Sequence, residues 1–485
     1  MSHARLRVLH AIHDFLPRHQ AGSEIYAFDL CRELARRHHV SVLCAEYDPA
    51  RQHGQVTWRV QDGLPVIEVV NNWVCRSFAD SYKSPVITEQ IAHVLEAVQP
   101  DVVHIHNLLN LSFGLPAVAH ARGIPVVATL HDYTLVCPSG GQRIHRAERH
   151  VCHVIDTDRC ARCFRESPFY AQMSFGALAA ATRAPGVIRR AALEVWRRLP
   201  IVAAGLARAA RRATLVPVTQ QDIAERLAAA RQVFDEVDVF VAPSRSLSAE
   251  FQRLGVNASK IRVSDLGFVP LLRGSRNGAQ RPLRIGYVGT LVWHKGVHVL
   301  IDAVRTLVPH AYELKIFGDP AGNPGYAAEL RAQAAGLPIR FMGAFAREAT
   351  ADVYAQIDVL VVPSLWLENS PLVIHEAWMT GIPIVGARIG GIADLVEHGV
   401  NGLLYTPTSS AELGDALRSL IEAPDRLDEF ARRLPRVKPL AQDAHEWEAV
   451  YGEVLERRGG GRGQTEVRLQ SDFQSDFSLT PRQVT

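Results

Sequence analysis

Two glutamates are the residues best placed to do chemistry in this sequence. Glu368 and Glu376 have seven residues between them and stand on either side of a predicted helix start. A carboxylate accepts hydrogen bonds from sugar hydroxyls, and the N-terminus of a helix attracts anions such as phosphate. Two acids beside such a helix predict a ligand with phosphates and hydroxyls. Two surface glutamates without a function would also fit, but Glu368 lies in a Trp-containing loop and not on a charged face.

A strand, a loop and a helix must position these two acids. The apolar run at residues 357–362 predicts a buried strand before the loop. Ser370 suits the N-cap of a helix and Pro371 its first position, so the expected helix covers residues 371–380. The short apolar run at 382–385 then predicts an inner parallel strand.

Strands and helices alternate in two long series, which is the pattern of doubly wound α/β sheets. The strands expected in the first series are 5–12, 40–45, 66–70, 101–106 and 125–130. Those expected in the second series, before the two acids, are 284–288, 313–317 and 339–342. A polar, breaker-rich stretch at 270–282 predicts the linker between the series.

The length of 485 residues is too great for one hydrophobic core and predicts two or three domains. We expect an N-terminal domain at residues 1–270, with a Cys- and Arg-rich insert at 137–234. A second domain is expected at 283–440. Residues 458–485 are rich in Gly, Arg, Gln and Ser with few apolar residues, so we expect them to be disordered.

Composition excludes some classes of function. The hydrophobic content of 47% and the charged content of 21% are ordinary for a globular chain. A formal net charge of +3 gives no argument for a nucleic-acid partner. No apolar run of membrane-spanning length and no signal-peptide core is visible. We therefore expect a cytoplasmic protein.

Four of the seven cysteines form a cluster in the insert. Cys137, Cys152, Cys160 and Cys163 have a C…C…CxxC arrangement, and four thiolates can hold a tetrahedral structural zinc. Reduced cysteines without a metal explain the pattern equally well, so both interpretations stay open. An odd number of cysteines argues against a disulfide framework.

An arginine-rich segment follows the cysteines. Residues 181–212 hold eight arginines against a single acid, Glu194, with Trp196 among them. A charged helix is usually a solvated face, but one sign of charge together with Trp favours contact with an anionic membrane surface. The expected protein is then peripheral to the inner face of the membrane.

The stretch around the two acids resembles one enzyme family. SLWLENSPLVIHEAWMTGIPIVGARIGGIADLVEHGVNGLLY is similar to the signature region of the retaining family 4 (group 1) glycosyltransferases of the GT-B fold. The resemblance implies two Rossmann-like domains facing across a cleft, with a helix at 441–457 crossing back to the first. It also implies transfer of a sugar from a UDP- or GDP-linked donor to a glycan or lipid-linked acceptor hydroxyl. Cell-surface or extracellular polysaccharide or glycolipid assembly is the expected setting.

The resemblance assigns roles in the second domain. Glu376 would bind the ribose of the nucleotide, Glu368 would contact the donor sugar, and Lys295 would neutralise the diphosphate. The backbone expected to meet the diphosphate is that of Ser370, Pro371, Leu372 and Val373. The family has an arginine where this chain has Thr290, so one expected cation is absent from that position.

The resemblance also assigns roles in the first domain. His131 would lie beside the donor sugar and be needed for activity. Gly22 retains one of two glycines that let the backbone approach the donor, because Ala21 replaces the other. His106 and Asn107 would either line the acceptor side or cap the sheet.

No cofactor is expected to be required for catalysis, because Lys295 and helix dipoles would take the place of a divalent ion. Two alternatives remain: a GT-B sugar-nucleotide epimerase, and a non-catalytic scaffold that binds nucleotide-sugars. Thr290 and Ala21 are the features that favour a scaffold.

Overall fold

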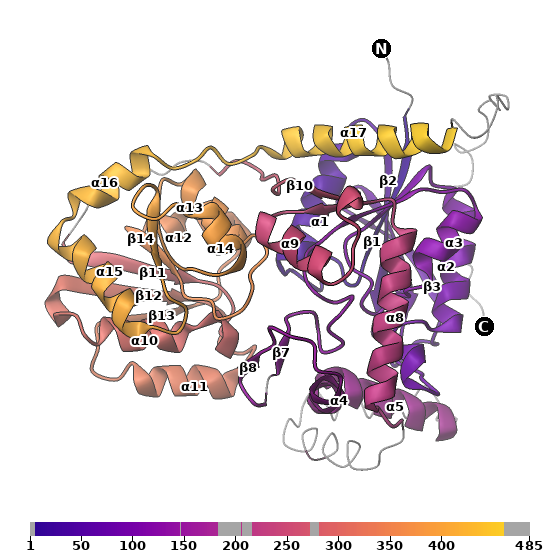
Figure 1. Ribbon diagram of the computed structural model, residues 1–485, viewed down its shortest axis with the longest axis horizontal. Coiled ribbons are helices and arrows are strands. Elements are labelled where there is room, and N and C mark those ends of the chain that lie inside the picture. The colour runs from indigo at the N-terminus through magenta and orange to yellow at the C-terminus, as the bar shows by residue number, and fades with distance from the viewer. Residues whose placement is uncertain (1–4, 146, 183–204, 206–215, 272–280, 460–485) are drawn as a thin grey trace, which may run out of the picture.

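The computed structural model describes residues 5–145, 147–182, 205, 216–271 and 281–459. It contains two large sheets, one in the first half of the chain and one in the second (Figure 1). Alternate residues of strand β1 (Arg7–Ile12) enter different hydrophobic cores, because neighbouring side chains of a strand point to opposite faces. Each sheet therefore has a core on both faces, which confirms the predicted fold class of two α/β halves.

The first half, defined as residues 5–271, is built on a sheet of eight strands. Its order is β10-β9-β6-β5-β1-β2-β4-β3, and every pairing is parallel except that of β3 with β4. The other strands are β2 (His39–Glu46), β3 (Val56–Gln61), β4 (Leu64–Val70), β5 (Val102–Ile105), β6 (Val126–Thr129), β9 (Val239–Ala242) and β10 (Ile261–Val263).

The sequence analysis missed strand β3. It forms an antiparallel edge hairpin with β4, and no residue in it is fully buried. Trp58 is 56% exposed there. The sequence VTWRVQ nevertheless alternates apolar and polar residues and is followed by Asp62 and Gly63, a common hairpin turn, so the local pattern could have predicted this strand.

Helices cover both faces of the first sheet (Figure 1). Helix α2 begins where Ser84 accepts a hydrogen bond from the backbone of Ile87, with proline at its first position. The helices of this half are α1 (Gly22–Leu34), α2 (Pro85–Val98), α3 (Leu115–Ala121), α4 (Thr157–Glu166), α5 (Pro168–Thr182), α8 (Gln220–Glu236) and α9 (Arg245–Arg253), with the short 3-10 helices η1 (Phe78–Ser81) and η2 (Ala258–Lys260).

The insert after β6 contains a two-stranded hairpin, β7 (Ile144–His145) with β8 (His150–Val151), followed by α4 and α5. Helix α8 was not predicted, although Thr219 and Asp222 form a capping box at its start. Most of the arginine-rich segment, at 183–204 and 206–212, lies outside the described residues, so membrane contact stays a prediction. Residues 460–485 of the predicted tail also lie outside them.

The second half, defined as residues 281–439, has a sheet of six parallel strands in the order β13-β12-β11-β14-β15-β16. The chain starts at β11 and places β12 on one side and β14 on the other, so the strand order reverses there. Ligands of such sheets bind beyond the carboxyl ends of the strands at this point. The strands are β11 (Leu283–Val288), β12 (Tyr312–Phe317), β13 (Ile339–Gly343), β14 (Val359–Val362), β15 (Ile384–Ala387) and β16 (Gly402–Tyr405).

Helices again cover this sheet, and α16 is one that the sequence analysis missed. The helices are α10 (Val297–Val304), α11 (Pro324–Gln333), α12 (Thr350–Tyr354), α13 (Leu372–Met379), α14 (Gly390–Leu395), α15 (Ser410–Glu422) and α16 (Asp425–Arg432), with the 3-10 helices η3 (Trp293–Lys295), η4 (Pro309–Ala311) and η5 (Arg347–Ala349).

The last helix, α17 (Leu440–Gly459), returns to the first half and packs against α1 (Figure 1). Its Tyr451 hydroxyl lies 2.8 Å from Nδ1 of His104 in β5. The two chain crossings between the halves run side by side, because Phe268 pairs with Pro439. Among the described helices, none combines the length and apolar character needed to cross a membrane.

Candidate functional site

Lys295 and Glu368 meet at the carboxyl ends of β11 and β14. Lys295 Nζ donates a hydrogen bond to Glu368 Oε1 over 2.6 Å, and the Ser364 hydroxyl donates to the same oxygen over 2.6 Å. The Glu368 side chain is 6% exposed, whereas that of Lys295 is 26% exposed. The structure thus brings together the predicted diphosphate cation and the predicted sugar-binding acid, with the cation the more accessible of the two.

Glycines hold the Glu368 loop in place. Gly296, directly after Lys295, has a φ of +72°, and a side-chain carbon there would lie 1.8 Å from the Pro363 carbonyl oxygen. A side-chain carbon on Gly391 would lie 1.9 Å from the Asn369 carbonyl oxygen. The Gly391 backbone also donates to the Glu368 carbonyl over 2.7 Å. Only residues without a Cβ permit these close approaches, so the loop is built on them.

Helix α13 begins one residue later than predicted. Its N-cap is Pro371, which offers no side-chain cap and has no N–H, so the prediction of Ser370 as N-cap was wrong. The Ser370 hydroxyl instead lies 2.9 Å from both Asp265 Oδ1 and His375 Nε2. The first N–H groups of a helix have no intrahelical acceptor, so those of Leu372 and Val373 are the ones oriented for an anion.

Glu376 lies in the second turn of α13, partly buried. Its Oε2 accepts a hydrogen bond from the Tyr354 hydroxyl over 2.9 Å. Burial raises the pKa of Glu376, while Tyr354 and the charge of Arg347 act in the opposite direction. The tyrosine holds one oxygen and fixes the orientation of the carboxylate.

Thr290 is exposed in the loop after β11, and its carbonyl accepts a hydrogen bond from the Tyr287 hydroxyl over 2.8 Å. A threonine side chain has no charge, so this position supplies no cation.

The first half meets this site through the start of α1. A side-chain carbon on Gly22 would lie 3.1 Å from Leu372, the first residue of α13. The N-termini of two helices from different halves therefore face each other, and both favour negative charge between them.

His131 follows β6 and also reaches the boundary. Its backbone carbonyl accepts a hydrogen bond from the side-chain amide of Asn369, the residue after Glu368. His131 thereby joins the Glu368 loop, from a position 238 residues away in the sequence. Burial lowers the pKa of His131 to about 4, so its imidazole is neutral at physiological pH.

A chain of buried histidines supports His131 from behind. His10 Nδ1 lies 2.9 Å from His106 Nε2, and His106 Nδ1 lies 3.0 Å from His131 Nε2. Burial lowers the pKa of His10 to about 3 and that of His106 well below its ordinary value. Each of these three imidazoles is therefore neutral, so one of its ring nitrogens carries a proton and donates while the other accepts.

The direction in which these histidines donate follows from His10, at the buried end of the row. Among the described residues, His10 Nε2 has no hydrogen-bond partner. A buried N–H without an acceptor is less well tolerated than a bare acceptor, so the proton of His10 belongs on Nδ1. His10 then donates to His106, His106 donates to His131, and His131 carries its own proton on Nδ1. The chain thus makes Nδ1 of His131 a hydrogen-bond donor.

His106 and Asn107 do not occupy an open acceptor face. Both are buried, at 3% and 5% exposure, and both ring nitrogens of His106 are already paired. Asn107 Nδ2 donates to Asp132 Oδ2 over 2.8 Å. Neither residue is exposed, and each holds a neighbour that lies closer to the boundary. Their acceptor role stays a prediction, and both line the pocket described next.

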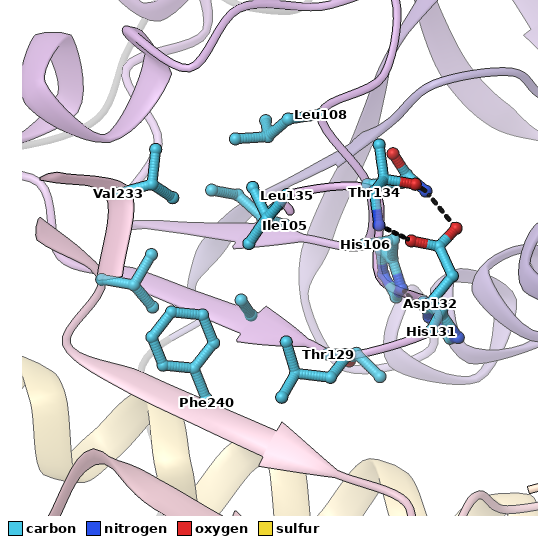
Figure 2. A pocket seen from close by; sticks show the side chains of 14 residues that line it. Ile105, His106, Leu108, Thr129, His131, Asp132, Thr134, Leu135, Val233 and Phe240 are labelled. Atoms are coloured by element: carbon cyan, nitrogen blue, oxygen red, sulfur yellow. Dashed lines mark hydrogen bonds between the residues drawn. The ribbon is translucent and has the colours of Figure 1, made fainter. Parts of the chain in front are cut away.

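A mainly apolar pocket lies behind the loop after His131 (Figure 2). Asp132 and His131 border it on one side, and Val233 and Phe240 on the other. Asp132 also accepts a hydrogen bond from the Thr134 backbone over 2.7 Å. These contacts fix the loop that carries His131.

The sequence analysis missed an acidic group beside His131. Glu24, 2% exposed in the first turn of α1, lies 3.2 Å from His13 Nε2 and accepts from Ser23. Burial alone would lower the pKa of His13, but the hydrogen bond and charge of Glu24 raise it above its ordinary value. The sequence offered one signal, a glutamate two residues after Gly22.

The four cysteines of the insert line one cavity. The insert also contains an Asp-x-Asp sequence at Asp156 and Asp158. Asp156 caps α4 by accepting from the backbone of Arg159, and Asp158 pairs with Arg162. Both carboxylates therefore stabilise the first turns of α4.

Comparison with known proteins agrees with this geometry. The family model "Glycosyl transferases group 1" matches residues 282–423, and the model "Glycosyltransferase Family 4" matches residues 21–167. The D-inositol 3-phosphate glycosyltransferase of Corynebacterium urealyticum is 30% identical over 230 residues, or 42% of this chain and 54% of that protein. The sulfoquinovosyl transferase of Arabidopsis thaliana is 29% identical over 200 residues, 38% of each chain. The chain spans about half the length of the first such relatives.

Solved structures share the fold over almost the whole chain. Anabaena HepE in complex with UDP and glucose is 18% identical, with a TM-score of 0.58 over 94% of this chain and all of that one. The sucrose-phosphate synthase of Thermosynechococcus elongatus is 16% identical, with a TM-score of 0.59 and the same coverage. The GT-B fold expected from the sequence is thereby confirmed.

Proposed function

Because the chain belongs to the family 4 and group 1 glycosyltransferases, we propose that it transfers a sugar from a nucleotide-sugar to an acceptor hydroxyl. The observation that carries this proposal is the meeting of Lys295, Glu368 and the start of α13 with His131 of the other half. A cation and helix N–H groups suit a diphosphate, and the carboxylate and imidazole beside them suit sugar hydroxyls.

Within this proposal, each group of the second half has a separate task. When the donor binds, Lys295 exchanges its hydrogen bond to Glu368 for one to the diphosphate. There it stabilises the negative charge that grows on the diphosphate as the bond to the sugar breaks. Glu368 is then free to accept hydrogen bonds from the sugar. Glu376, held by Tyr354, accepts both hydroxyls of the ribose.

The first half supplies the neutral His131. Its Nδ1–H donates to a hydroxyl of the donor sugar, and its lack of charge avoids repulsion with the positive charge that develops on the sugar ring. The acceptor hydroxyl loses its proton to the departing diphosphate oxygen as its own oxygen bonds to the anomeric carbon.

We further propose that the donor is UDP- or GDP-linked, that the anomeric configuration is retained, and that the acceptor is a glycan or a lipid-linked glycan. Assembly of cell-surface or extracellular polysaccharide is the proposed setting. The UDP and glucose in the Anabaena HepE structure support a UDP-sugar as the first donor to test.

A panel of UDP- and GDP-sugars tests the donor. We expect one sugar nucleotide to bind by calorimetry and to be hydrolysed slowly without an acceptor, since water can replace the acceptor hydroxyl. The anomeric configuration of the product, read by NMR before it mutarotates, tests retention. Binding to none of the panel would contradict the proposal.

Glu376→Ala tests the donor site directly. Loss of hydrogen bonds to a charged group, about 1.5–3 kcal/mol, weakens donor binding by about 10- to 100-fold. Asp415→Asn, whose side chain is 70% exposed on α15, is the matched control and should leave binding unchanged.

Product analysis of the wild-type protein separates the alternatives. A scaffold that binds without reacting would give binding but no product with any acceptor. An epimerase would convert the sugar nucleotide to its isomer with no acceptor present.

A further inference from the structure

The four cysteines of the insert come from elements that commonly present metal ligands. Cys137 precedes the β7–β8 hairpin, and Cys152 follows it directly. Their backbones are fixed, because Cys152 donates to the Arg143 carbonyl and Cys137 to the Tyr133 carbonyl, each over 2.7 Å. Cys160 and Cys163 lie three residues apart in α4, so they share one face of the helix.

All four side chains line one cavity between the hairpin and α4. The neighbouring histidines of the insert, His145, His150 and His153, do not line it. The chemistry of this cavity is therefore that of four thiols, which is the ligand set of tetrahedral structural zinc sites.

Arg143 and Arg159 line the cavity, whereas Arg226 does not. Arg226 of α8 is 4% exposed, and it donates to the carbonyls of Thr134 and Leu135 over 2.6 and 2.9 Å. The salt bridges among the described residues include none to Arg226. Its guanidinium also lies over the rings of Tyr82 and Phe113, 5.7 and 5.0 Å from their centroids. These rings and the two carbonyls stabilise the buried charge of Arg226.

The positive charge of Arg143 and Arg159 suits a negatively charged centre in the cavity, whereas a thiol that keeps its proton is neutral. A bound zinc ion deprotonates its thiol ligands outright. Four thiols that release four protons to solvent on binding one Zn²⁺ leave a centre with a charge of about −2 beside Arg143 and Arg159.

We propose that Cys137, Cys152, Cys160 and Cys163 bind one structural Zn²⁺ in the cavity between the hairpin and α4. In the described residues, no three of the sulfurs lie within 4.8 Å of one another. Zinc holds each sulfur at about 2.3 Å, so binding requires the cysteine side chains to rotate inward.

Such a zinc would stabilise two contacts of the proposed active site. At the base of the hairpin, Arg143 pairs with Glu250 and lies over the ring of Tyr133, two residues after His131. At its tip, Arg149 makes two hydrogen bonds, of 2.7 and 2.9 Å, to Glu329 in α11 of the second half. Val151 packs against the cores of both halves. The hairpin lies between α4 and α11 (Figure 1).

The test is the metal content of the full chain, purified without a histidine tag from zinc-supplemented medium. We expect one zinc per chain by mass spectrometry, released by a mercurial that titrates thiols. Exchange for Co²⁺ should give the near-ultraviolet absorption of thiolate-to-cobalt charge transfer and the visible bands of a tetrahedral site. These readouts do not depend on catalytic activity.

Variants locate the site. The double variant Cys160→Ser with Cys163→Ser should lose the zinc, whereas Cys75→Ala, buried elsewhere in the first half, should keep it. If the double variant fails to fold, the zinc content and the cobalt spectrum of the wild-type protein still test the proposal. Four thiols that react freely in a metal-free protein, or disulfides among these cysteines, would overturn the proposal.

Discussion

The two halves build their parts of the site in different ways. The second half uses charged and polar groups from one short stretch, Ser364 to Glu376, with Lys295 beside it. The first half uses neutral imidazoles from three strands, each held by the next. A phosphate-bearing ligand needs charge, which local sequence can supply. A hydrogen-bond donor of fixed direction needs a row of hydrogen-bonded side chains behind it, which only neighbouring strands can supply.

Acid should affect the two halves unequally, and this is the largest effect we expect. Burial lowers the pKa of His10, His104, His106 and His131 in the folded first half. The unfolded chain takes up protons below about pH 6.5 that the folded chain does not. Stability is therefore fully present above pH 6.5 and falls towards pH 4, by about 1.4 kcal/mol per pH unit for each histidine.

Hydrogen exchange at pH 7 and pH 5 measures this difference. We expect α1 and β5 to lose protection at pH 5 before β11 and β15 of the second half, where fewer histidines have a lowered pKa. His10→Gln should reduce the pH dependence by about one proton. Earlier loss of protection in the second half would contradict the comparison.

Removing the charge of the second half should affect catalysis next most strongly. Lys295→Ala is expected to lower kcat by about 10²- to 10³-fold, because one preorganised group that stabilises developing charge is lost. Lys295→Arg should retain part of the activity, and Lys83→Ala, at an exposed position, is the control. Unchanged kcat in Lys295→Ala would remove this lysine from the mechanism.

A substitution at Thr290 provides a second test of how the diphosphate is stabilised. If the absent cation at this position limits the stabilisation of the diphosphate, Thr290→Arg in the Lys295→Ala background should restore some of the lost kcat. No recovery would indicate that the exposed loop around Thr290 does not reach the diphosphate.

Breaking the histidine chain should have the smallest effect. His106→Leu removes one hydrogen bond to His131, about 1–1.5 kcal/mol, and should lower kcat by about tenfold with little change in donor affinity. Nitrogen NMR of His131 should show the proton leaving Nδ1 for part of the time. His445→Ala, whose side chain is 76% exposed, is the control, and an unchanged tautomer in His106→Leu would contradict the positioning role.

Much of the donor side was predictable because its residues are close in sequence. The strand before Glu368, the helix after it and the glycines around them follow local rules of burial and backbone conformation. The N-cap was predicted wrongly because Ser370 is paired instead with Asp265, which comes from the other half. A tertiary contact displaced a local preference there.

The sequence by itself determined the α/β alternation, the two halves and the stretch from Glu368 to Glu376. Only the tertiary structure decided that His106 pairs with His131, that Glu24 pairs with His13, and that Arg143 and Arg159 line the cavity of the four cysteines. The physical reason is that burial and hydrogen-bond direction depend on neighbours across a sheet. Parallel strands adjacent in space are separated in sequence by whole helices, and no local pattern records that pairing.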